Sequence, residues 1–190
     1  MTLFREARMQ TDAGLVEECR AGDASAFDEI VRRYKDRVYR VVYRFLGNHE
    51  DAPDVAQETF IRAYGGIREF RGSAQLCTWL HSIAANLARN RLRDGSRKGR
   101  NQGVPLNGMD PADDCSPRTS AERQELEDTL QRCLLELPEP YRMAFVLRTF
   151  DDLNYETIAQ TLGIPVGTVK SRINHARRLL RERLEELAIV

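Results

Sequence analysis

Side chains that can read DNA are concentrated between positions 155 and 180 of this 190-residue chain. Lysine, serine and asparagine can hydrogen-bond to base edges in the major groove, and arginine can pair with backbone phosphates. Apolar residues recur here at spacings of four, three and four, so they share the inward face of a helix and leave the polar residues outside. The inward residues are Val169, Ile173, Ala176 and Leu180. The outward residues are Lys170, Ser171, Asn174 and His175, followed by Arg177, Arg178 and Arg181.

A helix-turn-helix is the element that would position these side chains. Ile158, Ala159 and Leu162 form the apolar face of a shorter preceding helix. Gly163 permits a sharp turn, and Pro165 suits the first turn of the next helix. In helix-turn-helix proteins the N-terminal part of the second helix enters the major groove. The segment therefore predicts duplex DNA binding, while the alternative from these residues alone is a basic helix that contacts only solvent.

A second set of polar residues lies near position 90. Asn86, Asn90 and Arg93 are spaced i, i+4 and i+7, so they share one side of a helix with the neighbouring Arg89. Amides and guanidinium groups suit base edges and phosphates, and the preceding loop at 71–75 could receive an unstacked base. The alternative is a surface helix with ordinary exposed polar residues.

A third candidate surface is acidic. The helix predicted over 51–64 turns its apolar residues inward and leaves acids, a glutamine and an isoleucine outside. An exposed isoleucine beside acids is typical of a docking patch, although acids at a helix start also occur on plain solvated faces. The outward residues are Asp54, Gln57, Glu58, Ile61 and Arg62.

The elements that carry these surfaces all read as helices. Apolar residues recur at helical spacing almost everywhere outside one gap, and strand signals are nearly absent, so we expect an all-α protein. Long stripes cover 27–45, 52–63 and 76–87, a short first helix includes Leu15 and Cys19, and a second helical set begins near Leu126.

The gap lies at residues 95–120, where Gly, Pro, Asn, Asp and Ser replace the apolar pattern. This composition predicts a flexible linker between two small helical domains, 1–94 and 121–190. Roughly 25 linker residues extend to about 85 Å at most. Two turns of B-DNA, about 70 Å, lie within that reach. We therefore expect one chain to hold two DNA sites at once.

Composition excludes several classes of protein. The 29 basic and 29 acidic residues cancel, but they are segregated into basic and acidic stretches, which indicates two kinds of partner. No apolar run is long enough to span a membrane and no secretory signal is evident, so we expect a cytoplasmic protein without membrane contact. The four cysteines show no CxxC pair, so we expect reduced thiols and neither a metal nor a cofactor. Cys115, in a polar stretch, is a candidate for a redox role.

With these residues in view, the chain resembles a bacterial sigma factor of the extracytoplasmic-function group of the sigma-70 family. The resemblance covers about 15–94 and 125–187 and rests on several motifs, among them GDASAFDEIVRRY, DAPDVAQETFIRAY, TWLHSIAANLARNRLR and GIPVGTVKSRINHARRLL. Such proteins carry only the second and fourth conserved sigma regions. The resemblance implies a non-enzymatic factor that directs core RNA polymerase to promoters.

The resemblance also implies roles for individual residues. Binding to core RNA polymerase, at the clamp helices of its largest subunit, falls to Asp54, Gln57, Glu58 and Ile61, and contact with the polymerase flap is also expected. The −10 element, read as a melted single strand, falls to Arg71, Ser73, Asn86, Arg89, Asn90 and Arg93. The −35 element, read as duplex, falls to Thr168, Lys170, Ser171, Arg172, Asn174, His175 and Arg178.

Two further expectations concern regulation and rival functions. The resemblance implies an anti-sigma partner that covers the polymerase and DNA faces. A dimeric operator-binding regulator with the same helix-turn-helix is the main alternative, and it would need a ligand-sensing or dimerisation domain. A recombinase would need a nucleophile with a supporting acid, base or metal, and no such cluster is evident in the sequence.

Overall fold

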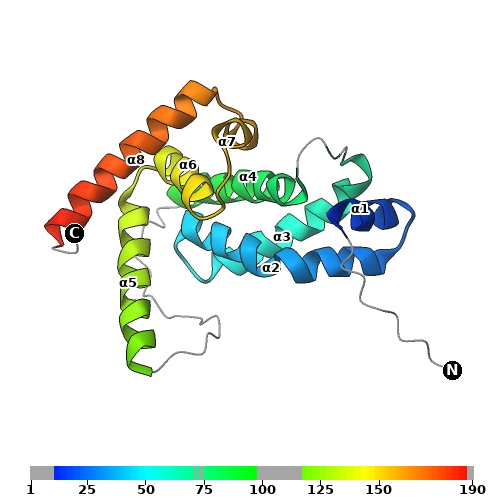
Figure 1. Ribbon diagram of the computed structural model, residues 1–190, viewed down its shortest axis with the longest axis horizontal. Coiled ribbons are helices and arrows are strands. Elements are labelled where there is room, and N and C mark those ends of the chain that lie inside the picture. Colours follow the sequence, from blue (N-terminus) through cyan, green and yellow to red (C-terminus); the bar gives the residue numbers. More distant parts are fainter. Residues whose placement is uncertain (1–10, 71, 73–74, 98–116, 188–190) are drawn as a thin grey trace.

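The computed structural model describes residues 11–70, 72, 75–97 and 117–187. Within these residues all regular structure is helical, which confirms the predicted all-α class (Figure 1). None of the described helices is both long and apolar enough to cross a membrane. The elements are α1 (Asp12–Arg20), α2 (Ala24–Leu46), α3 (Asp51–Gly66), the 3₁₀ helix η1 (Ile67–Glu69), α4 (Leu76–Arg97), α5 (Pro117–Glu136), α6 (Glu139–Thr149), α7 (Tyr155–Leu162) and α8 (Val166–Glu186).

Polar caps and glycines set the ends of the helices. The side chains of Thr11, Asp23 and Asn154 accept backbone N–H groups at the starts of α1, α2 and α7. Gly47 and Gly163 end α2 and α7 with φ angles of 73° and 65°, a left-handed conformation that glycine adopts without strain. Local sequence therefore determines where these helices begin and end.

An N-terminal bundle is formed by α2 packed against α1, α3 and α4. The side chains of Ile30, Val42, Phe45 and Leu80 in this bundle are fully buried. The inward face predicted for α3 is confirmed, because the residues concerned are all buried. They are Ala52, Val55, Ala56, Thr59, Phe60 and Ala63.

The C-terminal helices form a second set, with α6 packed against α7 and α8. Met143, Leu147, Ile158 and Ile173 are buried where these helices meet. α5 ends at Glu136, Pro138 caps the next helix, and α6 begins at Glu139 with a proline in its first turn. Pro165 differs slightly from the prediction: it occupies the cap position just before α8 rather than the first turn.

The two helical sets are in contact rather than separate. α7 packs against α4, α6 and α5 pack against α2, and the buried residues of both sets form one continuous core. The helices also enter both ends of the predicted linker, since α4 continues to Arg97 and α5 begins at Pro117. A glycine inside a helix costs only about 1 kcal/mol, and proline is well tolerated at the first helical position. The remaining linker residues, 98–116, lie outside the described residues.

The orientation of α8 can be tested with two neighbouring positions. Ile173→Ala should lower the free energy of unfolding by about 2–5 kcal/mol, because it removes a fully buried side chain. Asn174→Ala is the matched control; its side chain is exposed, so a change within about 0.5 kcal/mol is expected. Urea denaturation of both variants measures this, and equal losses would contradict the assigned inward face.

Candidate nucleic-acid interface

The turn between α7 and α8 holds the second helix in a defined position. The Gly163 N–H donates to the Ala159 carbonyl, and the next amide, of Ile164, donates to the same oxygen at 3.0 Å. The Pro165 carbonyl then accepts the N–H groups of Thr168 and Val169, which starts α8. The apolar stripe predicted for α8 is buried throughout, so its opposite face is left for a partner. That stripe is Val169, Ile173, Ala176 and Leu180.

The outward face of α8 carries the predicted DNA-reading side chains. Near its start, the Ser171 hydroxyl donates to the Thr168 carbonyl at 3.0 Å, and the Lys170 ammonium lies 5.8 Å from the centre of the Tyr155 ring. The His175 ring stacks on Tyr141 with 5.5 Å between centroids. These contacts orient the side chains without burying them. Lys170, Ser171, Asn174, His175 and Arg178 are exposed, while Thr168 and Arg172 are half-buried.

The predicted single-strand site on α4 is only partly described. Arg71 and Ser73 lie outside the described residues. On α4, Asn86, Asn90 and Arg93 are exposed, as their spacing predicts. Arg89 differs: its guanidinium Nε lies 3.4 Å from a carboxylate oxygen of Glu139 in α6. The amides are therefore open to a partner, while one guanidinium is paired with the C-terminal helices.

A cavity of about 830 Å³ lies beside the described part of the loop that precedes α4. Its walls include Tyr34, Arg37, Phe70 and Gln75, and Phe70 packs on Trp79 with ring centroids 4.9 Å apart. The Tyr34 hydroxyl donates to the Asp12 carboxylate. Burial, and then this hydrogen bond, raise the pKa of Tyr34, so the phenol keeps its proton. The cavity thus combines aromatic surface with hydrogen-bonding groups at the entrance to α4.

The acidic face of α3 is exposed and has internal partners. Asp54, Gln57 and Ile61 are exposed, and Ile61 retains 59% of its surface. Glu58 is half-buried and forms an ion pair with Arg62 at 2.8 Å. This acidic face also contacts α4, because a guanidinium nitrogen of Arg91 in α4 lies 3.6 Å from Asp54.

Sequence reasoning missed Tyr64 on the same helix. It lies three residues after Ile61, its exposed fraction is 56%, and its ring meets Phe27 edge-on with 5.0 Å between centroids. The sequence feature that could have identified Tyr64 is an aromatic residue at a position outside the buried face of α3. Together Ile61 and Tyr64 form an exposed apolar pair next to the acids.

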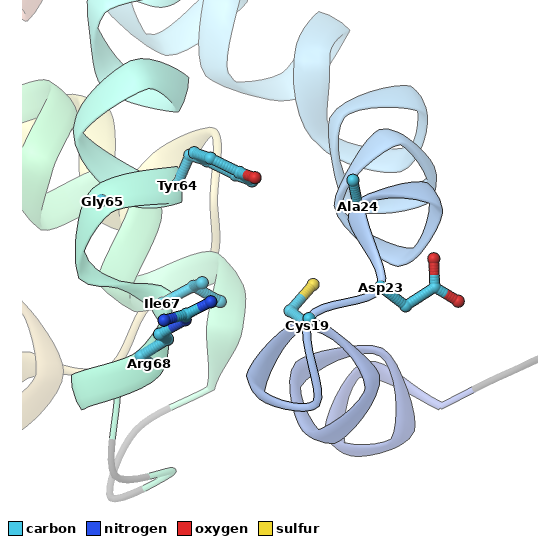
Figure 2. A pocket seen from close by; sticks show the side chains of 8 residues that line it. Cys19, Asp23, Ala24, Tyr64, Gly65, Ile67 and Arg68 are labelled. Carbon is cyan, nitrogen blue, oxygen red and sulfur yellow. The ribbon is translucent and has the colours of Figure 1, made fainter.

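Tyr64 also lines a smaller pocket of about 250 Å³. Figure 2 shows Tyr64, Ile67 and Arg68 on one side and Cys19 and Asp23, from the end of α1 and the start of α2, on the other. Burial is the main cause that raises the pKa of the Cys19 thiol, so it is protonated at neutral pH. The pocket borders the exposed apolar pair on α3 and contains none of the predicted DNA-reading residues.

The cysteines in the described segments are free and buried: Cys19, Cys77 and Cys133. Cys77 Sγ lies 3.7 Å from Nε2 of the buried His81. No group of histidines, cysteines and acids with the geometry of a metal site occurs among the described residues. Cys115, the redox candidate, lies outside them.

Two segments of the chain match models of known families. Residues 30–98 match Sigma-70 region 2, and residues 127–180 match Sigma-70, region 4. The chain is 39% identical over 180 residues to the ECF RNA polymerase sigma factor SigW of Bacillus subtilis (strain 168), covering 90% of this chain and 96% of that protein. It is 36% identical over 188 residues to the ECF RNA polymerase sigma-E factor of Haemophilus influenzae, covering 95% and 99% respectively.

Solved structures share this fold. The sigma factor RpoE from Bartonella quintana, determined in complex with the anti-sigma factor NepR, has a TM-score of 0.67 and 25% sequence identity, covering 84% of this chain and 96% of that chain. CnrH, determined in complex with the cytosolic domain of CnrY, also has a TM-score of 0.67, at 22% identity. The latter likeness shows the fold alone.

The burial of the Cys77 thiol can be tested by chemical labelling. In the native protein we expect a thiol reagent at about pH 8 to leave Cys77 unmodified, because burial raises its pKa to about 12. Peptide mapping by mass spectrometry measures this. The same treatment in denaturant is the control and should modify Cys77 fully. Native labelling as fast as that of the denatured chain would contradict the assigned burial.

Proposed function

The chain belongs to the extracytoplasmic-function sigma factors of the sigma-70 family, and on that premise we propose how its surfaces divide the work of promoter recognition. A sigma factor binds core RNA polymerase and directs it to promoter DNA, and the family is non-enzymatic. The observation that carries the assignment is that both conserved regions match on one chain. The same observation disfavours a dimeric operator-binding regulator, because the N-terminal half is a sigma region and not a ligand-sensing or dimerisation domain.

We propose that α8 reads the −35 element as duplex. Its exposed polar residues lie near its N-terminal end, which is the part of a recognition helix that enters the major groove. Lys170 and Asn174 have the chemistry for guanine and adenine edges respectively. Arg178, further along the helix, has the chemistry for phosphates, and its guanidinium also pairs with Glu182 at 2.9 Å.

We propose that α4 and the preceding loop bind the −10 element as a melted strand. Asn86 and Asn90 present exposed amides one helical turn apart, and the loop, which contains the predicted Arg71 and Ser73, precedes them. The neighbouring cavity offers the Phe70 ring and polar groups, which suit an unstacked base. Melting then follows as a population shift, because bound single-strand bases stabilise the open duplex.

We propose that α3 docks on the largest-subunit clamp helices of core polymerase. Asp54, Gln57, Glu58 and Ile61 provide charge and apolar surface together, and we add Tyr64 to this set. Helices of the C-terminal set would contact the polymerase flap. Each of the two DNA contacts is weak alone, but they become strong together once both are tethered to the same enzyme.

Control by an anti-sigma factor is the proposed regulation. The related RpoE from Bartonella quintana was determined bound to such a partner, and here both the α3 face and the α8 face are exposed for one. Because core polymerase and the chromosome are its partners, we place the action of the protein in the cytoplasm. The proposed function requires no cofactor bound to this chain.

Lys170→Ala tests the −35 assignment. If Lys170 contacts a base, binding to duplex that contains the element should weaken by about 1–3 kcal/mol, while binding to unrelated duplex changes little. Fluorescence anisotropy of the polymerase holoenzyme on both DNAs measures this. An equal loss on both would instead identify a phosphate contact and contradict base reading.

Glu58→Lys tests the docking face. It reverses a charge beside Ile61, so affinity for core polymerase should fall, while the affinity of the free chain for −35 duplex stays unchanged. Asp28→Lys, an equal charge change at an exposed position on α2, is the matched control. Competition against a labelled sigma factor for core enzyme measures the affinity. Equal affinity for Glu58→Lys and the parent would contradict the assignment.

A further inference from the structure

The lysine on the outward face of α8 lies beside an aromatic ring from another helix. Tyr155 is the first residue of α7, which packs against α8 (Figure 1). The Lys170 ammonium lies over the Tyr155 ring, 5.8 Å from its centre. An ammonium group within about 6 Å of a tyrosine ring is attracted by the negative charge of the ring face. The tyrosine therefore favours one position for a side chain that is otherwise exposed to solvent.

Lys170 has more to gain from such a contact than its neighbours on the reading face. Its ammonium is carried on a flexible four-carbon chain, and ordering that chain is among the largest side-chain entropy costs of any residue. Ser171 is short, and its hydroxyl already donates to the Thr168 carbonyl at 3.0 Å. His175 has a shorter and stiffer side chain, and its ring stacks on Tyr141. The direction of Lys170 therefore depends most on a neighbouring ring.

Local contacts fix the position of the Tyr155 ring. The Asn154 side chain accepts the Thr157 N–H at 2.7 Å, so α7 begins at Tyr155. Just before this cap, the Leu153 N–H donates to the Leu147 carbonyl at 3.2 Å, which ties the loop to α6. The Tyr155 side chain is half-buried. The ring is thus held in place by the protein itself.

A second cation, from α6, contacts the same ring. The Arg148 guanidinium lies 5.7 Å from the centre of the Tyr155 ring. Arg148 also donates to the Asp152 carboxylate at 3.0 Å and to the Leu153 carbonyl at 3.1 Å, so the loop after α6 fixes its position. The ring is therefore held by α6 as well as by its own helix, and its contact with Lys170 connects both helices to the outward face of α8.

We propose that Tyr155 is a positioning residue for −35 recognition, whose ring orders Lys170 and so sets how well the protein distinguishes the element from other duplex. The proposal rests on the function proposed above, in which Lys170 contacts a base. A lysine that is already directed loses less side-chain freedom on binding, and the attraction to the ring strengthens when DNA excludes water from the pair. Base contacts, unlike phosphate contacts, carry sequence information. The effect of Tyr155 should therefore pass through Lys170 and appear on the specific duplex.

The test is a double-mutant cycle in the polymerase holoenzyme assembled with the full-length chain. Tyr155→Leu removes the ring and keeps apolar bulk, and it is made in the parent and in the Lys170→Ala background. Tyr155→Phe keeps the ring and removes the hydroxyl. Tyr39→Leu is the matched control, because this half-buried tyrosine of α2 contacts Tyr43 and His49 instead of a DNA-reading residue. Fluorescence anisotropy measures affinity for duplex that contains the −35 element and for unrelated duplex.

We expect Tyr155→Leu to weaken binding to the −35 duplex about two- to fivefold and to leave binding to unrelated duplex unchanged. Tyr155→Phe and Tyr39→Leu should bind both duplexes as the parent does. In the Lys170→Ala background, Tyr155→Leu should cause no further loss, because its effect passes through the lysine.

Fluorinated phenylalanines at position 155 separate the charge of the ring from its packing. Fluorine withdraws charge from the ring face and nearly preserves the shape of the ring, so affinity for the −35 duplex should fall stepwise as one, two and three fluorine atoms are introduced. This series decides the question even if Tyr155→Leu disturbs the fold, which urea denaturation of each free chain measures. An affinity that does not change along the series would overturn the positioning role.

Three results of the mutant cycle would also overturn it. They are an equal loss on both duplexes, a loss of the same size with and without Lys170, and a loss in Tyr155→Phe as large as that in Tyr155→Leu, which would identify a contact of the hydroxyl. Each of these leaves the proposed function standing. Failure of the parent holoenzyme to prefer the −35 duplex would overturn the proposed function itself.

Discussion

Each helix of this protein buries one apolar stripe, and that constraint decides which side chains are available to partners. The stripe of α8 packs under α6, so the residues between its apolar positions must face outward. Each fully buried leucine, isoleucine or valine contributes about 1.5–3 kcal/mol, far more than an exposed lysine or asparagine loses by facing water. The outward faces therefore need no stabilising contacts of their own, and the residues proposed to read DNA remain exposed.

Charge is balanced over the whole chain but not over its surface. The 29 basic and 29 acidic residues cancel, yet polar and basic residues gather on the outer faces of α4 and α8, and acids gather on the outer face of α3. The structure brings some of these opposite charges together, as in the contacts of Arg91 with Asp51 and Asp54. Such exposed pairs are weak and screened by salt. A polyanion such as DNA can displace these ion pairs, so they do not prevent a partner from binding the faces that carry them.

Most of the fold and most of the candidate site were predictable because both depend on local spacing. Helix ends followed from caps and from Gly47 and Gly163, and the exposed positions of Asn86, Asn90 and Lys170 followed from periodicity. The ends of the linker were less predictable, because a glycine or a first-turn proline penalises a helix only weakly. Tyr64 was missed because periodicity identifies inward residues and does not rank outward ones.

The sequence by itself determined the helices, their buried faces and the kinds of side chain that each presents, since residues three and four apart lie on one side of any helix. Only the tertiary structure decided that the two helical sets lie against each other and that Asp151 meets Arg37 across 114 positions of the chain. It also decided that Arg89 faces Glu139 and that Arg91 faces the acids of α3. Helical periodicity predicts the face on which a charged side chain lies, but not its partner in another helix. That partner depends on how whole helices pack, and the packing is set by contacts between residues far apart in the chain.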